Sequence, residues 1–96
     1  MKRSYYMERL KKNYKWFVGI DVSKNELDFA VMQDSSLLLH TEITNAKDNI
    51  ATFLRTLKEK VPGFRVASTL FCMEAIGFYA AALKKRLHTL KANLAV

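Results

Sequence analysis

Residues 16–28, WFVGIDVSKNELD, contain the pattern that decides the fold of this 96-residue chain. Their first part, 16–22, is a nearly unbroken apolar run, which is typical of a central strand buried on both faces. Asp21 stands near the end of that run, and the polar residues 23–26 predict a tight turn. The segment therefore predicts a buried strand that ends in an acid and turns back on itself.

The remaining elements follow from the spacing of the apolar residues. Asn45 is predicted to begin the first helix and to cap it, its side chain accepting from the amide of Asp48. Pro62 and Gly63 are predicted to end that helix. In chain order, we expect strands at 16–22, 27–32 and 37–44, a helix from 45, a strand at 66–73, a helix at 78–90 and a strand from 93. The predicted fold class is α/β, a mixed sheet in the order β-β-β-α-β-α-β, with the fourth strand parallel to the first.

Length and composition limit the class of protein. A chain of this size forms one small domain, and 50% hydrophobic residues argue against disorder. The single cysteine, Cys72, allows no intramolecular disulfide and is predicted to be a buried core thiol. No apolar stretch reaches the roughly 20 residues of a membrane span, and the basic N-terminus lacks the apolar region expected of a secretory signal. We expect a cytoplasmic protein with a basic arm at 1–15 and a folded part at 16–96.

The net charge of +7 is unevenly distributed. Residues 1–15 hold six Lys and Arg against one Glu, and no acid follows Glu74. Basic clusters bind nucleic acids by displacing condensed counterions, although such clusters can also be solvated surfaces that bind nothing. The candidates for nucleic-acid binding are Lys11, Lys12, Lys15, Lys84, Lys85 and Arg86.

Two acids are candidate catalytic residues and metal ligands. Asp21 and Glu74 each follow a strongly apolar strand, and the carboxyl ends of parallel strands meet at one edge of a sheet. Two close carboxylates favour a shared cation, and Mg²⁺ prefers such oxygen ligands. The alternative is that Asp21 opens a turn and Glu74 caps a helix. If residues 22 and 27 pair, Asp28 faces Asp21, and Lys24 could offset the repulsion; both are candidates for supporting roles.

Residues 17–28 and 73–79 (MEAIGFY) resemble two blocks of the DEDD insertion-sequence transposases of the one-hundred-and-ten family, relatives of the pilin-gene invertases. These begin with a Gly-Ile-Asp-Val-Ser-Lys block and later carry a Glu-Ala-Thr-Gly-x-Tyr block. The resemblance implies a RuvC-like, ribonuclease H-like domain that holds Mg²⁺ or Mn²⁺ with three Asp and one Glu. Asp21 matches the first Asp and Glu74 the Glu. Ile76 departs from the pattern, because the family usually has a hydroxyl residue there.

The resemblance also implies what this chain lacks. The family's other two Asp follow the fifth strand, and its nucleophilic serine lies in a further domain, so we expect a truncated fragment that is inactive alone. Family members are bacterial proteins that cut and rejoin DNA as homo-oligomers guided by a structured RNA from the element.

Three other functions are open. The first is a non-catalytic module that binds nucleic acid through its basic residues. The second is an ATP-binding domain of the actin-like and sugar-kinase class, which also begins with a strand ending in Gly-Ile-Asp but needs a small or glycine-rich phosphate loop. Residues 23–26 contain no glycine. The third is a pseudogene product that folds poorly.

Overall fold

The structure, a computed structural model, describes residues 14–73 and 77–95, with only the backbone of residues 77 and 78. Most of the predicted basic arm, residues 1–13, therefore lies outside the described residues, as do Glu74 and Val96. Within the described ranges, no helix is long and apolar enough to cross a bilayer.

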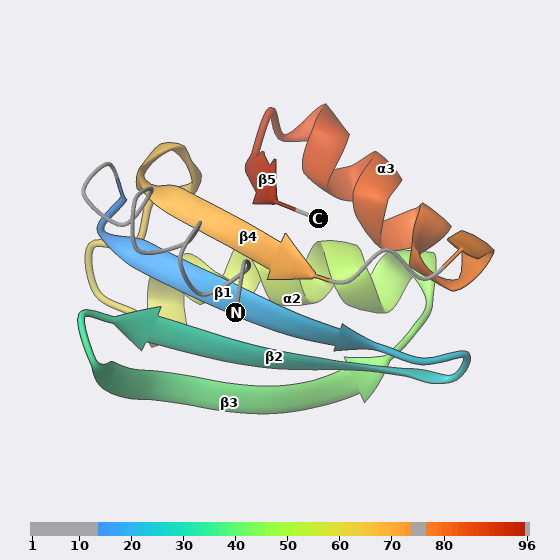
Figure 1. The fold of residues 1–96 in the computed structure, drawn as a ribbon, viewed down its shortest axis with the longest axis horizontal. Helices are drawn as coiled ribbons and strands as arrows, with labels where there is room; N and C mark the ends of the chain where they lie inside the picture. The colour runs from blue at the N-terminus through green and yellow to red at the C-terminus, as the bar shows by residue number, and fades with distance from the viewer. Residues whose placement is uncertain (1–13, 74–76, 96) are drawn as a thin grey trace.

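The core element is a mixed five-stranded sheet in the spatial order β3-β2-β1-β4-β5 (Figure 1). The strands β1, β2 and β3 form an antiparallel meander, whereas β4 and β5 run parallel to β1. The mixed α/β sheet that the sequence predicts is thus confirmed. The strands are β1 (Trp16–Val22), β2 (Glu26–Gln33), β3 (Ser36–Thr44), β4 (Thr69–Met73) and β5 (Asn93–Ala95).

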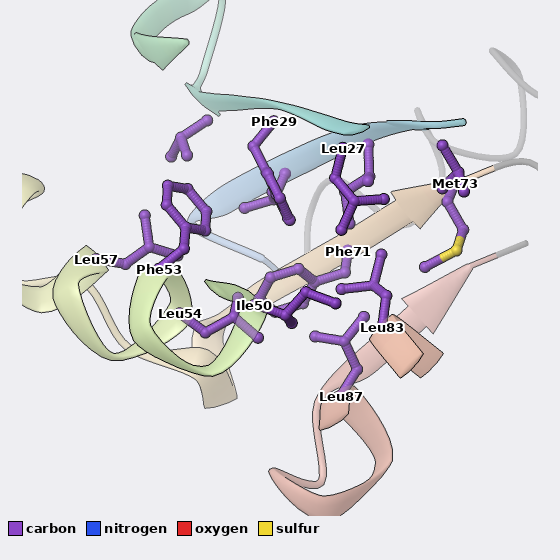
Figure 2. Packing of buried hydrophobic residues seen from close by; sticks show 14 of the residues in the cluster. Leu27, Phe29, Ile50, Phe53, Leu54, Leu57, Phe71, Met73, Leu83 and Leu87 are labelled. Atoms are coloured by element: carbon purple, nitrogen blue, oxygen red, sulfur yellow. The ribbon is translucent and has the colours of Figure 1, made fainter. Parts of the chain in front are cut away.

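Two α-helices, α2 (Lys47–Lys60) and α3 (Ala81–Thr89), pack against one face of this sheet, the inner face. Side chains of β2 alternate, so that Leu27 and Phe29 point towards the helices (Figure 2). Phe29 meets Phe53 of α2 with ring centroids 4.4 Å apart. Burial of each large apolar side chain contributes roughly 1.5–3 kcal/mol. The spacing i, i+3, i+4, i+7 in the sequence predicts one apolar stripe on this helix, and its members are all buried: Ile50, Phe53, Leu54 and Leu57.

The opposite, outer face of the sheet carries a smaller apolar cluster. Phe17, Leu70 and Cys72 form it, and the ring of Tyr14 meets that of Phe17 edge-on at 6.2 Å. Cys72 is a buried thiol, as predicted. Among the described residues, no side chain of α2 or α3 belongs to this cluster.

The elements after α2 differ from the prediction. β4 begins at Thr69 rather than residue 66, because 66–68 form a 3-10 turn and the Thr69 hydroxyl donates back to the Arg65 carbonyl. The helix expected at 78–90 is shorter, since residues 77–80 form another 3-10 turn. A 3-10 helix has three residues per turn, so Tyr79 no longer shares a face with the apolar residues of α3 and is exposed. Leu90 follows the last helical turn and is exposed as well. The sequence spacing predicts one apolar stripe of Tyr79, Leu83, Leu87 and Leu90, of which only Leu83 and Leu87 are buried.

The predicted cap of α2 is wrong. The helix begins at Lys47, and its N-cap residue Ala46 makes no side-chain capping bond. The Asn45 side chain donates hydrogen bonds to two distant loops instead of accepting one from Asp48. The predicted end of α2 is confirmed: Val61 donates to the Leu57 carbonyl, and Gly63 adopts a φ of 80°, which a residue without Cβ tolerates best.

Candidate functional site

The carboxyl ends of β1 and β4 define the candidate site. These strands are parallel neighbours, and their register pairs Ile20 with Met73. Asp21 follows Ile20, and Glu74 follows Met73 in the sequence. Ligands of open α/β sheets gather beyond the carboxyl ends of parallel strands. Because Glu74 lies outside the described residues, its roles as a catalytic residue and metal ligand stay predictions.

Asp21 and Asp28 are direct cross-strand partners at this end of the sheet. The register pairs Val22 with Leu27 and Asp21 with Asp28, as the sequence predicts. Both acids alternate with buried residues of the inner face and therefore belong to the outer face. Like charges directly opposite one another destabilise a strand pair, so this position favours a neighbouring cation.

Asp28 lies beside His40, whereas the sequence suggests Lys24 as a group that could offset the repulsion between Asp21 and Asp28. His40 Nε2 lies 2.6 Å from Asp28 Oδ1, with the two side chains 58% and 38% exposed. This Oδ1 has no hydrogen-bond partner of good geometry, so the contact is close but poorly angled, and it is an ion pair only when the imidazole carries a proton on both nitrogens. Such exposed pairs contribute about 0–1 kcal/mol. Lys24 is exposed at the turn.

The sequence interpretation gives His40 no role, although the alternation of residues along β3 indicates on which face of the sheet it lies. Ala30 pairs with His40, and Asp28 pairs with Glu42. Period-two alternation therefore puts His40 on the outer face, diagonal to Asp28. Finding this contact from sequence requires the register of β2 against β3. An irregularity between Val31 and Met32 shifts that register.

Asn45 connects three segments around the candidate site. Its Nδ2 donates to the carbonyl oxygens of Ser23 and Tyr79, each at 2.8 Å. Its backbone N–H donates to the Asn25 carbonyl, also at 2.8 Å. One side chain thus joins the β1–β2 turn, the end of β3 and the 3-10 turn before α3. Asn45 is a positioning residue for the turn that follows Asp21.

The β1–β2 turn closes on itself. The Ser23 backbone N–H donates to the Glu26 carbonyl at 3.0 Å. The Ser23 hydroxyl donates to the same carbonyl at 2.9 Å, and the Glu26 N–H lies 3.2 Å from that hydroxyl oxygen. Two amides of this turn therefore have partners inside the turn and are not available to a phosphate group.

The donor chemistry at this edge suits Mg²⁺, which prefers hard carboxylate oxygens. Asp21 and Asp28 supply such oxygens within the described chain. Across residues 14–73 and 77–95, however, no group of three or more potential metal ligands gathers. A metal site here would need Glu74 as well.

The structure describes only part of the predicted set of nucleic-acid-binding residues. Lys11 and Lys12 lie outside the described residues, and Lys15 lies beyond the far end of β1 from Asp21, about 20 Å along the strand. The Lys15 ammonium sits 4.8 Å from the centroid of the Trp16 ring. On α3, Lys84, Lys85 and Arg86 are consecutive and so point about 100° apart; Lys85 is exposed and the other two are half-buried.

Comparison with known proteins gives a fold and no family. No family model and no curated protein matches this sequence. Among solved structures, the chain is similar to a Bacteroides thetaiotaomicron protein described as having an actin-like ATPase fold and unknown function. The TM-score is 0.64 at 12% identity, over 97% of this chain and 37% of that one. This chain thus spans about a third of that protein, and the likeness shows the fold alone.

Proposed function

We propose that this chain is the first part of a ribonuclease H-like, RuvC-like nuclease domain of a bacterial insertion-sequence transposase. In this proposal it belongs to the one-hundred-and-ten family, works in the cytoplasm and acts on DNA phosphodiesters. The resemblance of residues 17–28 and 73–79 to that family motivates the proposal.

The parallel pairing of β1 with β4 carries the proposal. Ile20 and Met73 are register partners, and the two candidate ligands, Asp21 and Glu74, are the residues that follow them. Because these strand ends are adjacent, two acids that follow them can lie close enough to share one cation. A different strand order would have separated these positions by at least one more strand, about 4.8 Å per strand.

In the proposed site, Asp21 and Glu74 hold Mg²⁺ or Mn²⁺, which when bound polarises a phosphodiester and activates a water or a DNA 3′-hydroxyl. Asp28 and its neighbour His40 lie next to Asp21 and determine the local charge there. Asn45 holds the adjoining turn in place. Two ligating carboxylates bind a divalent ion weakly. The isolated chain is therefore expected to bind the metal without cleaving DNA.

Mn²⁺ binding to the 96-residue chain, measured by electron paramagnetic resonance of the free ion, tests the proposal. We expect weak, saturable binding that Asp21→Asn and Glu74→Gln each reduce at least tenfold, since each removes one charged ligand (a loss of about 1.4 kcal/mol). Asp34→Asn is the matched control, because Asp34 is exposed in the β2–β3 turn and should not matter. Equal binding by all four proteins would contradict the proposal, and so would plasmid nicking by the isolated chain that Asp21→Asn abolishes.

The structural likeness to an actin-like ATPase fold favours a second candidate, an ATP-binding domain. Phosphate loops use free backbone amides, yet the amides of Ser23 and Glu26 are occupied within the turn. ATP binding by calorimetry separates the two functions. Micromolar binding of Mg-ATP by the isolated chain would support the kinase class, and its absence agrees with the nuclease.

A further inference from the structure

Strand β3 forms a free edge of the sheet. It pairs with β2 on one side, and nothing in the described chain lies beyond it (Figure 1). Such an edge presents unpaired backbone N–H and C=O groups that can pair with another strand. Proteins often protect an edge with Lys or Pro, but β3 contains no Lys, Arg or Pro although the chain has 16 Lys and Arg.

The regular part of this edge is limited on both sides. Leu38 has no partner in the β2–β3 register, because Val31 pairs with Leu39 and Met32 with Leu37. After Thr44 the chain leaves the strand towards α2. Residues 39–44 are therefore the part of β3 with which another strand can pair in regular geometry. Leu37 and Leu38, just outside this stretch, are 57% and 43% exposed.

We propose that a second copy of this chain pairs antiparallel with β3, related by a two-fold axis that brings the two Thr41 residues opposite each other. In this register, His40 of each copy faces Glu42 of the other, and Leu39 faces Ile43. Each imidazole can donate to the facing carboxylate. Leu39 and Ile43 are half-buried beside the inner-face core, so their pairing extends that core from one sheet into the next.

Two features favour this register over registers centred on neighbouring positions of β3: the placement of charged side chains and the alternation of side chains between the two sheet faces. A dimer centred on Glu42 would set the two Glu42 carboxylates directly opposite each other, which is destabilising. A dimer centred on His40 would use the irregular Leu38. A shift by half a step, centred between Thr41 and Glu42, would set an inner-face residue of one copy opposite an outer-face residue of the other, whereas directly opposite residues of an antiparallel pair share one face. The Thr41-centred register places no two carboxylates opposite each other, and it pairs residues 39–43, which are regular, in both copies.

The proposed register also offsets a row of like charges that is unfavourable in the single chain. Asp21, Asp28 and Glu42 lie side by side on three neighbouring strands of the outer face. In the proposed dimer, His40 of the second copy is the next residue in that row. Each row of three acids then ends on an imidazole from the other chain.

Sedimentation of the 96-residue chain over a range of concentrations provides the first test. We expect a reversible dimer that His40→Glu weakens roughly tenfold, because two facing pairs become repulsive. The double exchange His40→Glu/Glu42→His restores facing pairs and should recover the dimer. His88→Glu, on the exposed end of α3, is the matched control and should dimerise as the wild type does. Circular dichroism establishes that each variant is folded.

A wild type that stays monomeric at all concentrations would overturn the proposal, as would a dimer that the exchange does not restore. Disulfide formation gives a second readout that does not depend on charge. Thr41→Cys should oxidise to a covalent dimer, because the two positions meet on the axis within reach of a disulfide. Thr44→Cys should not, because its two copies lie roughly 20 Å apart along the strands. Equal cross-linking of both variants would exclude this register.

Discussion

Asp21 and Asp28 lie directly opposite each other across β1 and β2, on the sheet face opposite to the one that α2 and α3 cover. Two carboxylates in this relation repel, and the imidazole of His40 lies beside Asp28. A folded chain without metal therefore retains an unfavourable interaction at the position where the proposed cation binds. Stability and metal binding should change in opposite directions when one of these charges is removed.

Asp21→Asn should raise the free energy of unfolding in EDTA by about 0.2–1 kcal/mol, because it removes a directly opposed like charge. Urea denaturation followed by circular dichroism measures the change. Asp34→Asn is the control, since Asp34 has a positive φ of 56° that asparagine also tolerates. If Asp21→Asn is no more stable than the wild type, the repulsion inferred from the register is offset by another group.

Asn45→Ala should lower the free energy of unfolding by about 1–3 kcal/mol, because two side-chain hydrogen bonds that join separate loops are lost. Asn45→Asp should be similarly destabilised, since a carboxylate cannot donate to the carbonyls of Ser23 and Tyr79. Asn49→Ala, exposed within α2, is the matched control and should be neutral or slightly stabilising. The same urea denaturation measures all three. A stable Asn45→Ala protein would show that these two bonds do not hold the turn.

The contrast between Asn45 and the apolar residues shows what can be read from the sequence. The alternation of Leu27, Phe29 and Val31 and the spacing of Ile50 and Phe53 predict buried faces, because burial depends on periodicity that a linear sequence displays. The hydrogen bonds of Asn45 could not be predicted in this way. They join residues 22 and 34 positions apart, and capping geometry is a common alternative for an asparagine before a helix.

The same distinction applies to the candidate site. The pairing of Asp21 with Asp28 follows from a four-residue turn, and a local pattern is sufficient to predict it. The contact of His40 with Asp28 depends on the register of β3, which an irregularity at Leu38 alters. Sequence periodicity does not reveal such an irregularity. The 3-10 turn at 77–80 likewise interrupts a helical spacing that runs through it in the sequence.

Leu27→Ala should lower the free energy of unfolding by about 2–5 kcal/mol, because the side chain is fully buried between the sheet and the helices. Leu37→Ala, the same substitution at the exposed end of the same hairpin, should change it by less than about 0.5 kcal/mol. Thermal denaturation of both variants measures the difference. Similar losses in the two proteins would mean that the exposed leucine is covered in solution, at a surface outside the proposed dimer register.

The basic residues of α3 provide a test of the non-catalytic alternative. Lys84→Ala/Lys85→Ala should weaken binding to a labelled DNA or RNA duplex, because each lost phosphate contact reduces the slope of log affinity against log salt by about 1. Lys58→Ala/Lys60→Ala, with two exposed lysines near the end of α2, is the matched control. Fluorescence anisotropy at several salt concentrations measures both. Binding that persists in Asp21→Asn/Glu74→Gln but falls in the Lys84/Lys85 variant would assign nucleic-acid affinity to α3 independently of the acids. An unchanged slope in that variant would remove α3 from the interface.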